Sequence, residues 1–256
     1  MFIMTHYFII SSPLEQFELV TLLPLTLYGL NFSITNSTLF MLIGVMVLIF
    51  WVSLSFYKNT LIPNNWQLLK ELIYKVTANM IQDNLGSKGE LYFPFIFTLH
   101  LFLLSCNLLG MVPYSFTVTS HITFTFGLAL SIFIAINIIG AQAHGLKFFA
   151  LFLPRGVPLP IVPLLIAIEL LSYIIKVFTL SIRLFANMTS GHTLLKIIAG
   201  FAWTMLSAGG LLAVFHLLPL GLLLILIGLE LAIAGLQAYV FTLLTCIYLN
   251  DVLDLH

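Results

Sequence analysis

Long apolar runs recur along the chain and predict helices that cross a membrane. Residues 38–57 form the first run, twenty residues without a charge, which is long enough for a bilayer core of about 30 Å. Residues 91–145 hold two further runs separated by Pro113, and we expect them to form a helix pair. Residues 163–249 hold two longer runs, the second of which begins at Pro219.

A different pattern follows the first run. In residues 66–85 apolar and charged side chains alternate with helical spacing, which is typical of an amphipathic helix lying on the membrane surface. The apolar positions are Trp66, Leu69, Ile73, Val76 and Met80, and the charged positions are Lys70, Glu71, Lys75 and Asp83.

The last two runs predict helices that are longer than a membrane is thick. Neither the stretch from Pro163 to about Ala199 nor that from Pro219 to about Leu249 has an internal proline, and 36 residues of helix measure roughly 54 Å. The first helix either breaks near Gly191 or lies steeply tilted, and a polar pattern that stays in phase along it favours tilt. The dipeptide Gly209-Gly210 predicts a turn, so the two helices should form an antiparallel hairpin. Prolines 154, 158, 160 and 163 exclude a continuous helix before it.

Composition supports a membrane protein and excludes several other classes. Hydrophobic residues make up 61% and charged residues only 7% of the chain, whereas soluble proteins average about 25% charged. The neutral net charge gives no basic surface for nucleic acid. Cys106 and Cys246 lie inside apolar runs, so neither a disulfide framework nor a cysteine metal site is expected. We therefore expect one all-α, polytopic membrane domain over residues 1–256, with about five membrane helices and one amphipathic surface helix.

Basic residues predict the orientation in the membrane. Residues 1–57 and the loop after Pro113 carry no Lys or Arg, whereas the intervening segment and the later connector contain Lys58, Lys70, Lys75, Lys88, Lys147 and Arg155. The positive-inside rule then places the N-terminus outside and the C-terminus inside. Residues 1–12 lack the basic region of a secretory signal, which suggests synthesis in a bacterium or an organelle, although a short leader that is later trimmed is an open alternative.

A polar stripe runs along the first of the two long helices. Charges inside membrane helices cost about 2.5–3.5 kcal/mol each and mark functional sites by default. The polar residues within about 40° of Arg183 on the helix are Glu169, Ser172, Lys176, Thr179, Asn187 and Ser190. On the second helix Glu230 and Gln237 share a face, and Gly221, Gly228 and Gly235 form a small-residue stripe opposite them, suited to close packing.

Folding the hairpin at residues 210–211 brings polar residues together at three levels. The predicted pairs are His192 with Glu230, Arg183 with Gln237, and Glu169 with Asp251. Proton-exchangeable groups then lie on both sides of a permanently charged arginine, which indicates two half-paths for protons with a barrier between them.

Simpler roles are open for several polar residues. Glu169 and Lys176 could form a structural ion pair, and Lys176 and Lys196 could extend to an interface. His100 and His144 could be packing residues, and Asn107 could cap or link helices. A secondary transporter would usually show two repeated halves with interrupted helices, which we do not find, and a purely structural subunit would not need three polar levels.

Several segments together resemble one known family. These are residues 182–192 (IRLFANMTSGH), 230–240 (ELAIAGLQAYV) and 248–251 (YLND). They resemble the signature of subunit a of F-type ATP synthases. Residues 12–17 (SPLEQF), 111–116 (MVPYSF) and 156–160 (GVPLP), together with the pair of His192 and Glu230, are similar to its mitochondrial branch.

The resemblance implies a stator beside a rotating ring of small c subunits, each with one carboxylate. Arg183 would face the ring and keep a passing carboxylate ionised. His192 and Glu230 would form the outer half-channel and Glu169 and Asp251 the inner one. The supporting polar residues would be Asn187, Gln237, Lys176 and Ser190.

The resemblance also implies the setting of the protein. The partners would be the c-ring, the peripheral stalk and other membrane-sector subunits, and lipids, and no cofactor or metal is expected. The subunit would be non-catalytic, since the chain has no GxxxxGK[ST] phosphate loop. The location would be the mitochondrial inner membrane, with the N-terminus in the intermembrane space and the C-terminus in the matrix.

Overall fold

The protein is an all-α membrane protein, as the sequence predicts. The computed structural model describes residues 12–27, 30–31, 33–56, 63–112, 115–145, 148, 161–210 and 212–253. Within these residues five helical stretches are long and apolar enough to cross a membrane, namely Asn36–Ser53, Asn65–Gly110, Ile122–His144, Val162–Ala208 and Leu217–Leu253. Residues 57–58, the proline-rich connector and the basic residues Lys147 and Arg155 lie outside the described part.

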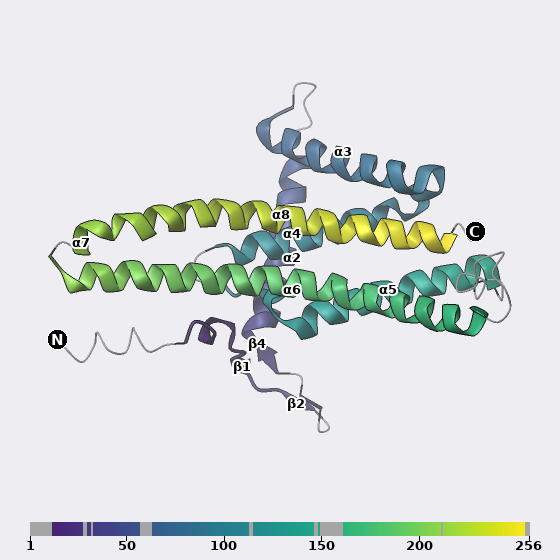
Figure 1. Ribbon diagram of the computed structural model, residues 1–256. Coiled ribbons are helices and arrows are strands. Elements are labelled where there is room, and N and C mark those ends of the chain that lie inside the picture. The colour runs from purple at the N-terminus through teal and green to yellow at the C-terminus, as the bar shows by residue number, and fades with distance from the viewer. Residues whose placement is uncertain are drawn as a thin grey trace.

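The two longest helices form the antiparallel hairpin that dominates the molecule (Figure 1). They are α6 (Val162–Ala208) and α8 (Leu217–Leu253), joined through the short α7 (Leu212–Phe215). Gly209 and Gly210 have φ angles of 71° and 61°, a region that glycine enters without strain. The expected turn is therefore present.

Helix α6 is longer than the sequence pattern suggested. It ends at Ala208 rather than near Ala199, because the residues after 199 contain neither proline nor a glycine in the left-handed region before Gly209. It also continues through Gly191, so the alternative of a break at that residue is excluded. At 1.5 Å per residue its 47 residues measure roughly 70 Å, which leaves tilt as the way to fit it into a membrane.

A second helix pair covers one side of the hairpin. Helices α4 (Phe93–Gly110) and α5 (Ile122–His144) lie alongside α6 and α8. The core is where these four helices meet, and its fully buried side chains include Ile96, Leu103, Leu184 and Phe241. The pair therefore fixes one face of the hairpin and leaves the other face open.

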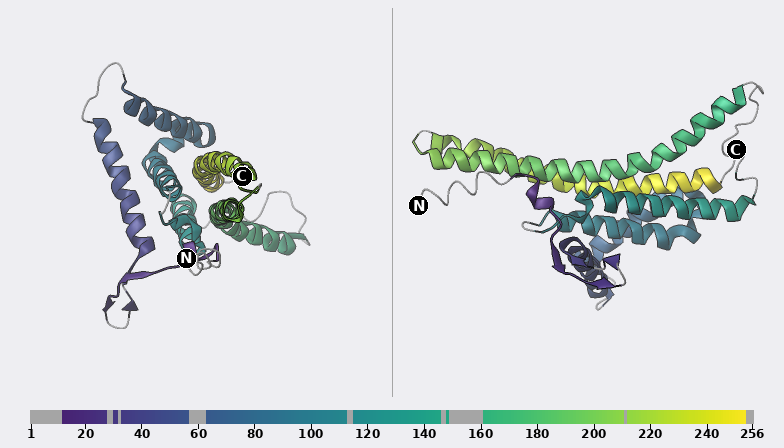
Figure 2. Two further views of the ribbon diagram at one scale, coloured as in Figure 1. Left: turned by 90° about the vertical axis from the view of Figure 1, so that its left-hand side faces the viewer. Right: turned by 90° about the horizontal axis from the view of Figure 1, so that it is seen from below.

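Helices α2 (Asn36–Phe56) and α3 (Asn65–Leu85) complete the helical framework. Helix α2 runs across the direction of the hairpin, as the view along the hairpin axis shows (Figure 2). Helix α3 follows the predicted amphipathic segment closely and packs Met80, Ile81 and Leu85 into the core. A 3-10 helix, η2 (Gly86–Tyr92), connects it to α4.

Small strands precede α2, which the sequence analysis did not predict. β1 (Thr21–Leu23) pairs with β4 (Ile34–Thr35), and β2 (Thr26–Leu27) pairs with β3 (Leu30–Asn31), both antiparallel. Two further 3-10 turns are η1 (Glu15–Phe17) and η3 (Val118–Ser120).

Candidate functional site

The predicted outer pair is brought together between α6 and α8. His192 Nδ1 lies 3.5 Å from Glu230 Oε1, and the two side chains are only 15% and 6% exposed. Neither carboxylate oxygen of Glu230, nor Nε2 of His192, has a hydrogen-bond partner among the described residues. A buried carboxylate with unused acceptors has capacity left for water or for a proton.

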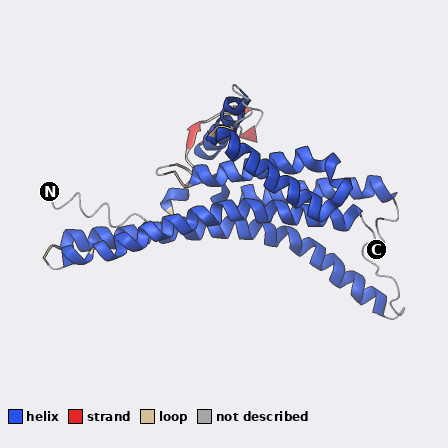
Figure 3. Ribbon diagram, turned by 90° about the horizontal axis from the view of Figure 1, so that it is seen from above, coloured by secondary structure: helices blue, strands red, loops and turns tan. Residues whose placement is uncertain are grey.

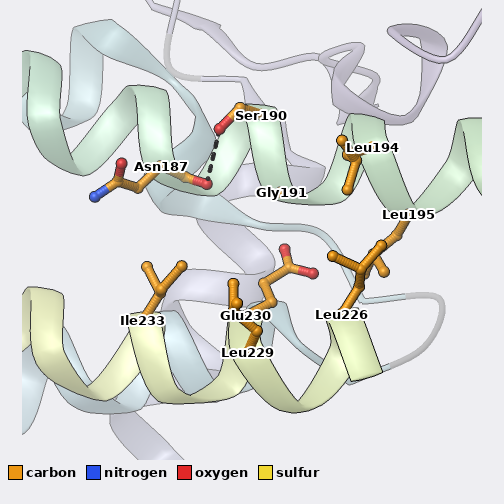
Figure 4. A pocket seen from close by; sticks show the side chains of 9 residues that line it. All are labelled: Asn187, Ser190, Gly191, Leu194, Leu195, Leu226, Leu229, Glu230 and Ile233. Atoms are coloured by element: carbon orange, nitrogen blue, oxygen red, sulfur yellow. Dashed lines mark hydrogen bonds between the residues drawn. The ribbon is translucent and has the colours of Figure 1, made fainter. Parts of the chain in front are cut away.

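Gly191 makes the room that Glu230 occupies. A Cβ atom at this position would lie 2.6 Å from Glu230 Oε1 and 2.9 Å from its Cδ, closer than real contacts allow. Figure 4 shows the Glu230 side chain extending from α8 toward the backbone of α6 at Gly191. The absence of a side chain at residue 191 therefore lets the carboxylate reach the surface of α6.

A pocket of about 200 Å³ lies next to this carboxylate. Its lining residues are Asn187, Ser190, Gly191, Leu194 and Leu195 from α6 and Leu226, Leu229, Glu230 and Ile233 from α8 (Figure 4). Since a water molecule takes about 30 Å³ in the liquid, several waters fit. Asn187, Ser190 and Leu194 share the helix face of Arg183, whereas His192 lies on the opposite face. Glu230 thus lies between His192 and a pocket that opens on the arginine side.

The middle level differs from the prediction. Gln237 is buried and accepts a hydrogen bond from Asn187 Nδ2 at 2.9 Å, so Arg183 is not its partner. Asn187 is one turn beyond Arg183 and rotated by about 40° toward the buried face of α6. This rotation places Asn187 at α8 and leaves Arg183 at the edge of the hairpin.

The predicted pair at the innermost level, Glu169 with Asp251, is also wrong. Asp251 pairs with Lys176 at 3.4 Å rather than with Glu169. The Lys176 amine also lies over the rings of Tyr173 and Tyr248, 5.8 and 5.0 Å from their centroids. The first part of α6 swings away from α8 (Figures 2 and 3). Glu169 lies in this part of α6 and is exposed, whereas Lys176, two turns closer to the hairpin turn, contacts Asp251.

Arg183 is exposed on the face that the other helices leave open. It has neither a hydrogen bond nor an ion pair with any residue that the structure describes. Its neighbours on the stripe, Ser172, Thr179 and Ser190, are exposed as well, and so is Glu169. Among the described residues, no group of three His, Cys, Asp or Glu side chains could hold a metal ion.

Comparison with known proteins agrees with this architecture. The family model for the ATP synthase A chain matches residues 38–250. The chain is 81% identical to ATP synthase subunit a of Chondrus crispus over 99% of this chain and 100% of the relative. It is 51% identical to ATP synthase subunit a of Marchantia polymorpha over 96% and 99% of the two chains.

The chain belongs to the ATP synthase subunit a family. Members of this family are the proton-translocating subunits of the ATP synthase membrane sector. The protein is therefore a membrane-embedded subunit that works in a complex with other ATP synthase subunits. Another relative, ATP synthase subunit a-2 of Arabidopsis thaliana, is 51% identical over 96% of this chain and 73% of its own length.

Sequence reasoning missed several contacts around the family's polar seam. The sequence pattern predicts no role for Gly191 beyond a possible helix break and its place in the family segment 182–192. It also predicts no contact of Lys176 with Tyr173 or Tyr248. Both could have been found by their position on the faces of α6 and α8. Lys196 also makes a contact that the sequence did not predict, because its Nζ donates a hydrogen bond to the Ser12 carbonyl oxygen at 3.3 Å.

The isolated polar residues of the other helices link helices together. His100 Nδ1 lies 3.2 Å from Thr242 Oγ1, and Asn107 Nδ2 donates to the Ala234 carbonyl oxygen at 3.1 Å. His144 Nε2 lies 3.1 Å from the carbonyl oxygen of Leu253. Each of these bonds ties the α4–α5 pair to α8. The glycine stripe of α8 (Gly221, Gly228 and Gly235), in contrast, has no atom of the described chain within 4 Å of where a Cβ would stand.

Proposed function

We propose that this chain couples proton flow to rotation of a ring of c subunits by holding Arg183 against the ring. The observation that carries the proposal is the exposed, unpaired guanidinium on the open face of a membrane helix. Arginine cannot lose its charge in a protein, and an unpaired charge is costly in a membrane. No residue that the structure describes supplies an anionic partner, and a carboxylate on each ring subunit would supply one.

The outer half-channel would use His192 and Glu230. The contact between these side chains and the pocket beside Glu230 support a relay of this kind. Protons would pass from His192 to Glu230 and through water in the pocket toward the ring carboxylate on the Arg183 side. Gly191, Asn187 and Ser190 would shape this passage, and Gln237 would hold Asn187 in place.

The inner half-channel would use Asp251 and Glu169 on the opposite side of Arg183. Asp251 is 44% exposed, so it can exchange protons with water even while it pairs with Lys176. Glu169 lies two turns further along α6 and would line the exit. Arg183 stands between the two paths, and its fixed charge would keep a ring carboxylate ionised and stop protons passing directly.

The remaining features of the proposal follow from the family. The subunit would be non-catalytic, since it would conduct protons and bind no nucleotide. Each proton that crosses a membrane potential of 100 mV supplies about 2.3 kcal/mol. It would lie in the mitochondrial inner membrane among lipids, the c-ring and the peripheral stalk. The N-terminus would face the intermembrane space and the C-terminus the matrix.

The test replaces Arg183 in the assembled complex reconstituted in lipid vesicles. Arg183→Ala should abolish proton-driven ATP synthesis and raise the passive proton leak, because both the partner of the ring carboxylate and the barrier are lost. Arg183→Lys should support synthesis only in part, because a lysine ammonium that the ring covers can lose its proton. Ile182→Ala, at the exposed neighbouring position, is the control and should leave both quantities unchanged. Normal coupled synthesis by intact Arg183→Ala complexes would contradict the proposal.

A further inference from the structure

A short turn near the start of the chain lies against the proposed outer half-channel. The Phe17 ring, at the end of η1, meets the His192 ring edge-on, with centroids 6.5 Å apart and planes at 65°. One helical turn beyond His192, the Lys196 amine donates its hydrogen bond to the Ser12 carbonyl oxygen. Two residues of α6 therefore contact this N-terminal turn, defined here as Ser12–Phe17, which lies beside the hairpin in Figure 1.

The N-terminal turn has its own internal support. The backbone N–H of Ser12 donates to Glu15 Oε1 at 3.1 Å, and the N–H of Leu14 donates to Ser12 Oγ at 3.2 Å. The bond from the Ser12 N–H to Glu15 is one half of a capping box, while the serine hydroxyl here accepts from Leu14 instead of from Glu15. The Glu15 N–H also donates to the Ser12 carbonyl oxygen at 3.1 Å, so this oxygen serves both the turn and Lys196.

The chain after the turn is fixed as well. Asn36, the first residue of α2, donates from Nδ2 to the Glu18 carbonyl oxygen at 3.0 Å and accepts from the Val20 N–H at 3.3 Å. The turn is thus held at one end by Lys196 of α6 and at the other by the start of α2. This arrangement gives Phe17 a defined place against His192.

The His192 ring depends on such a neighbour for its orientation. Its Nδ1 is 3.5 Å from Glu230 Oε1, longer than a charge-assisted hydrogen bond of about 2.7–2.9 Å. Its Nε2 has no hydrogen-bond partner among the described residues. Hydrogen bonds therefore do not fix the rotation of the imidazole. An edge-to-face aromatic contact does restrict it, because the positive ring edge favours the negative face of its neighbour.

We propose that Phe17 is a positioning residue for His192, and that Lys196 keeps Phe17 in place by binding the Ser12 carbonyl. The proposal rests on the proposed function of His192 and Glu230 as the outer relay. Phe17 holds the imidazole toward the Glu230 carboxylate, and without it the ring turns away and proton delivery slows.

The experiment measures proton-driven ATP synthesis by the assembled complex in lipid vesicles, per amount of complex. Phe17→Ala should lower the rate by about 2- to 10-fold, the range that one aromatic pair is worth. Phe17→Tyr keeps the aromatic ring and should retain most of the synthesis rate. Phe17→Leu keeps a bulky apolar side chain without the ring, and its rate should fall as in Phe17→Ala. Leu14→Ala is the matched control, since Leu14 lies in the same turn with its side chain exposed, and it should have no effect.

A second variant covers the case in which Phe17→Ala complexes assemble poorly. Lys196→Met removes the bond to the Ser12 carbonyl while leaving Phe17 present, and it should lower the rate to a similar extent. An unchanged rate in Phe17→Ala, or equal losses in Phe17→Ala and Phe17→Tyr, would overturn the proposal. Normal synthesis by Glu230→Gln would instead overturn the relay itself, so the two failures are distinguishable.

Discussion

Glu230 differs from the other acidic residues of the described chain in its surroundings. Of the acidic side chains that the structure describes, it alone is buried, and it has no hydrogen bond. A buried carboxylate with a purely structural role would be expected to have its oxygens satisfied, because leaving them unpaired is costly. Among the described residues, the one ionisable side chain paired with it is His192, whose Nδ1 lies 3.5 Å from Glu230 Oε1. A pocket large enough for water lies alongside. This environment suits a group that takes up and releases protons.

Glu230→Gln should block proton delivery while leaving the complex assembled. The amide has nearly the same shape as the carboxylate, so packing against Gly191 is retained, but it cannot take and give a proton. General acid–base groups contribute about 10²–10⁴-fold, and we expect proton-driven ATP synthesis to fall by about 10²-fold or more. Synthesis rates in vesicles, with complex content measured by native gel, provide the check.

A matched control removes an acid elsewhere in the chain. Glu90 lies in η2 and is exposed, away from the hairpin seam. Glu90→Gln makes the same chemical change and should leave synthesis unaffected. If Glu230→Gln and Glu90→Gln gave equal rates, Glu230 would not belong to the proton path.

At the scale of helices, the site depends on how closely α6 approaches α8. Gly191 sets this approach, because Glu230 fills the space where a side chain would stand. An added methyl group cannot coexist with the observed position of the carboxylate. The far end of a glutamate can move, however, so a substitution should displace Glu230 rather than separate the helices.

Gly191→Ala should therefore reduce proton-driven synthesis by about tenfold or more without loss of assembly, because displacement of Glu230 breaks its contact with His192. Gly200→Ala is the matched control on the same helix, since no atom lies within 4 Å of where its Cβ would stand. Both changes favour helix by about 0.5–1 kcal/mol, so only Gly191→Ala should impair synthesis.

The shorter side chain in Gly191→Ala/Glu230→Asp should recover part of the rate. Equal activity of Gly191→Ala and Gly200→Ala complexes would show that the close approach is not needed. This comparison separates the effect of displacing Glu230 from any general effect of alanine on α6.

The helices themselves were predictable, and so was the level nearest the turn. Apolar runs and prolines determine where helices can form, and Gly209-Gly210 determines where the hairpin turns. Counting outward from that turn places His192 beside Glu230 because only a few helical turns separate them from it. The structure has this pair in contact.

The levels further from the turn could not be obtained by counting. Counting assumes two straight, parallel helices, whereas α6 curves away from α8 toward its N-terminal end (Figure 3). It also ignores side-chain length and rotation, which bring Lys176 rather than Glu169 to Asp251, and Asn187 rather than Arg183 to Gln237. Contacts with the N-terminal turn could not be predicted either, because no periodicity connects residues 12–17 with α6.

At the scale of the whole molecule, the helices point in two directions. Helix α2 has 21 residues, about 32 Å at 1.5 Å per residue, which matches the thickness of the hydrocarbon core. The hairpin and the α4–α5 pair run across it (Figure 2). If α2 crosses the membrane upright, the two helices of the hairpin and the α4–α5 pair must lie at a shallow angle within it. A shallow angle explains how α6 and α8 can be longer than the membrane is thick. It also places the polar residues along the two helices at different depths in the membrane.

Helix α3 provides a marker for the side of the membrane. Its second half is anchored in the core, while Trp66, Leu69 and Val76 in the first half are exposed. An apolar stripe that no part of the described chain covers, with charged residues on the other side, is typical of a helix lying in the membrane interface. By the positive-inside rule we predict that this helix lies on the inner side and the N-terminal turn on the outer side.

Cysteine labelling tests this orientation directly. The native Cys106 and Cys246 are buried, so they should react slowly with a membrane-impermeant maleimide. Lys75→Cys, at an exposed position on α3, should be labelled only when the reagent has access to the inner side. Leu14→Cys, in the N-terminal turn, should be labelled only from the outer side and serves as the opposite marker. Labelling of Leu14→Cys and Lys75→Cys from the same side would refute the predicted topology. The chain between these two positions would then cross the membrane an even number of times instead of once through α2.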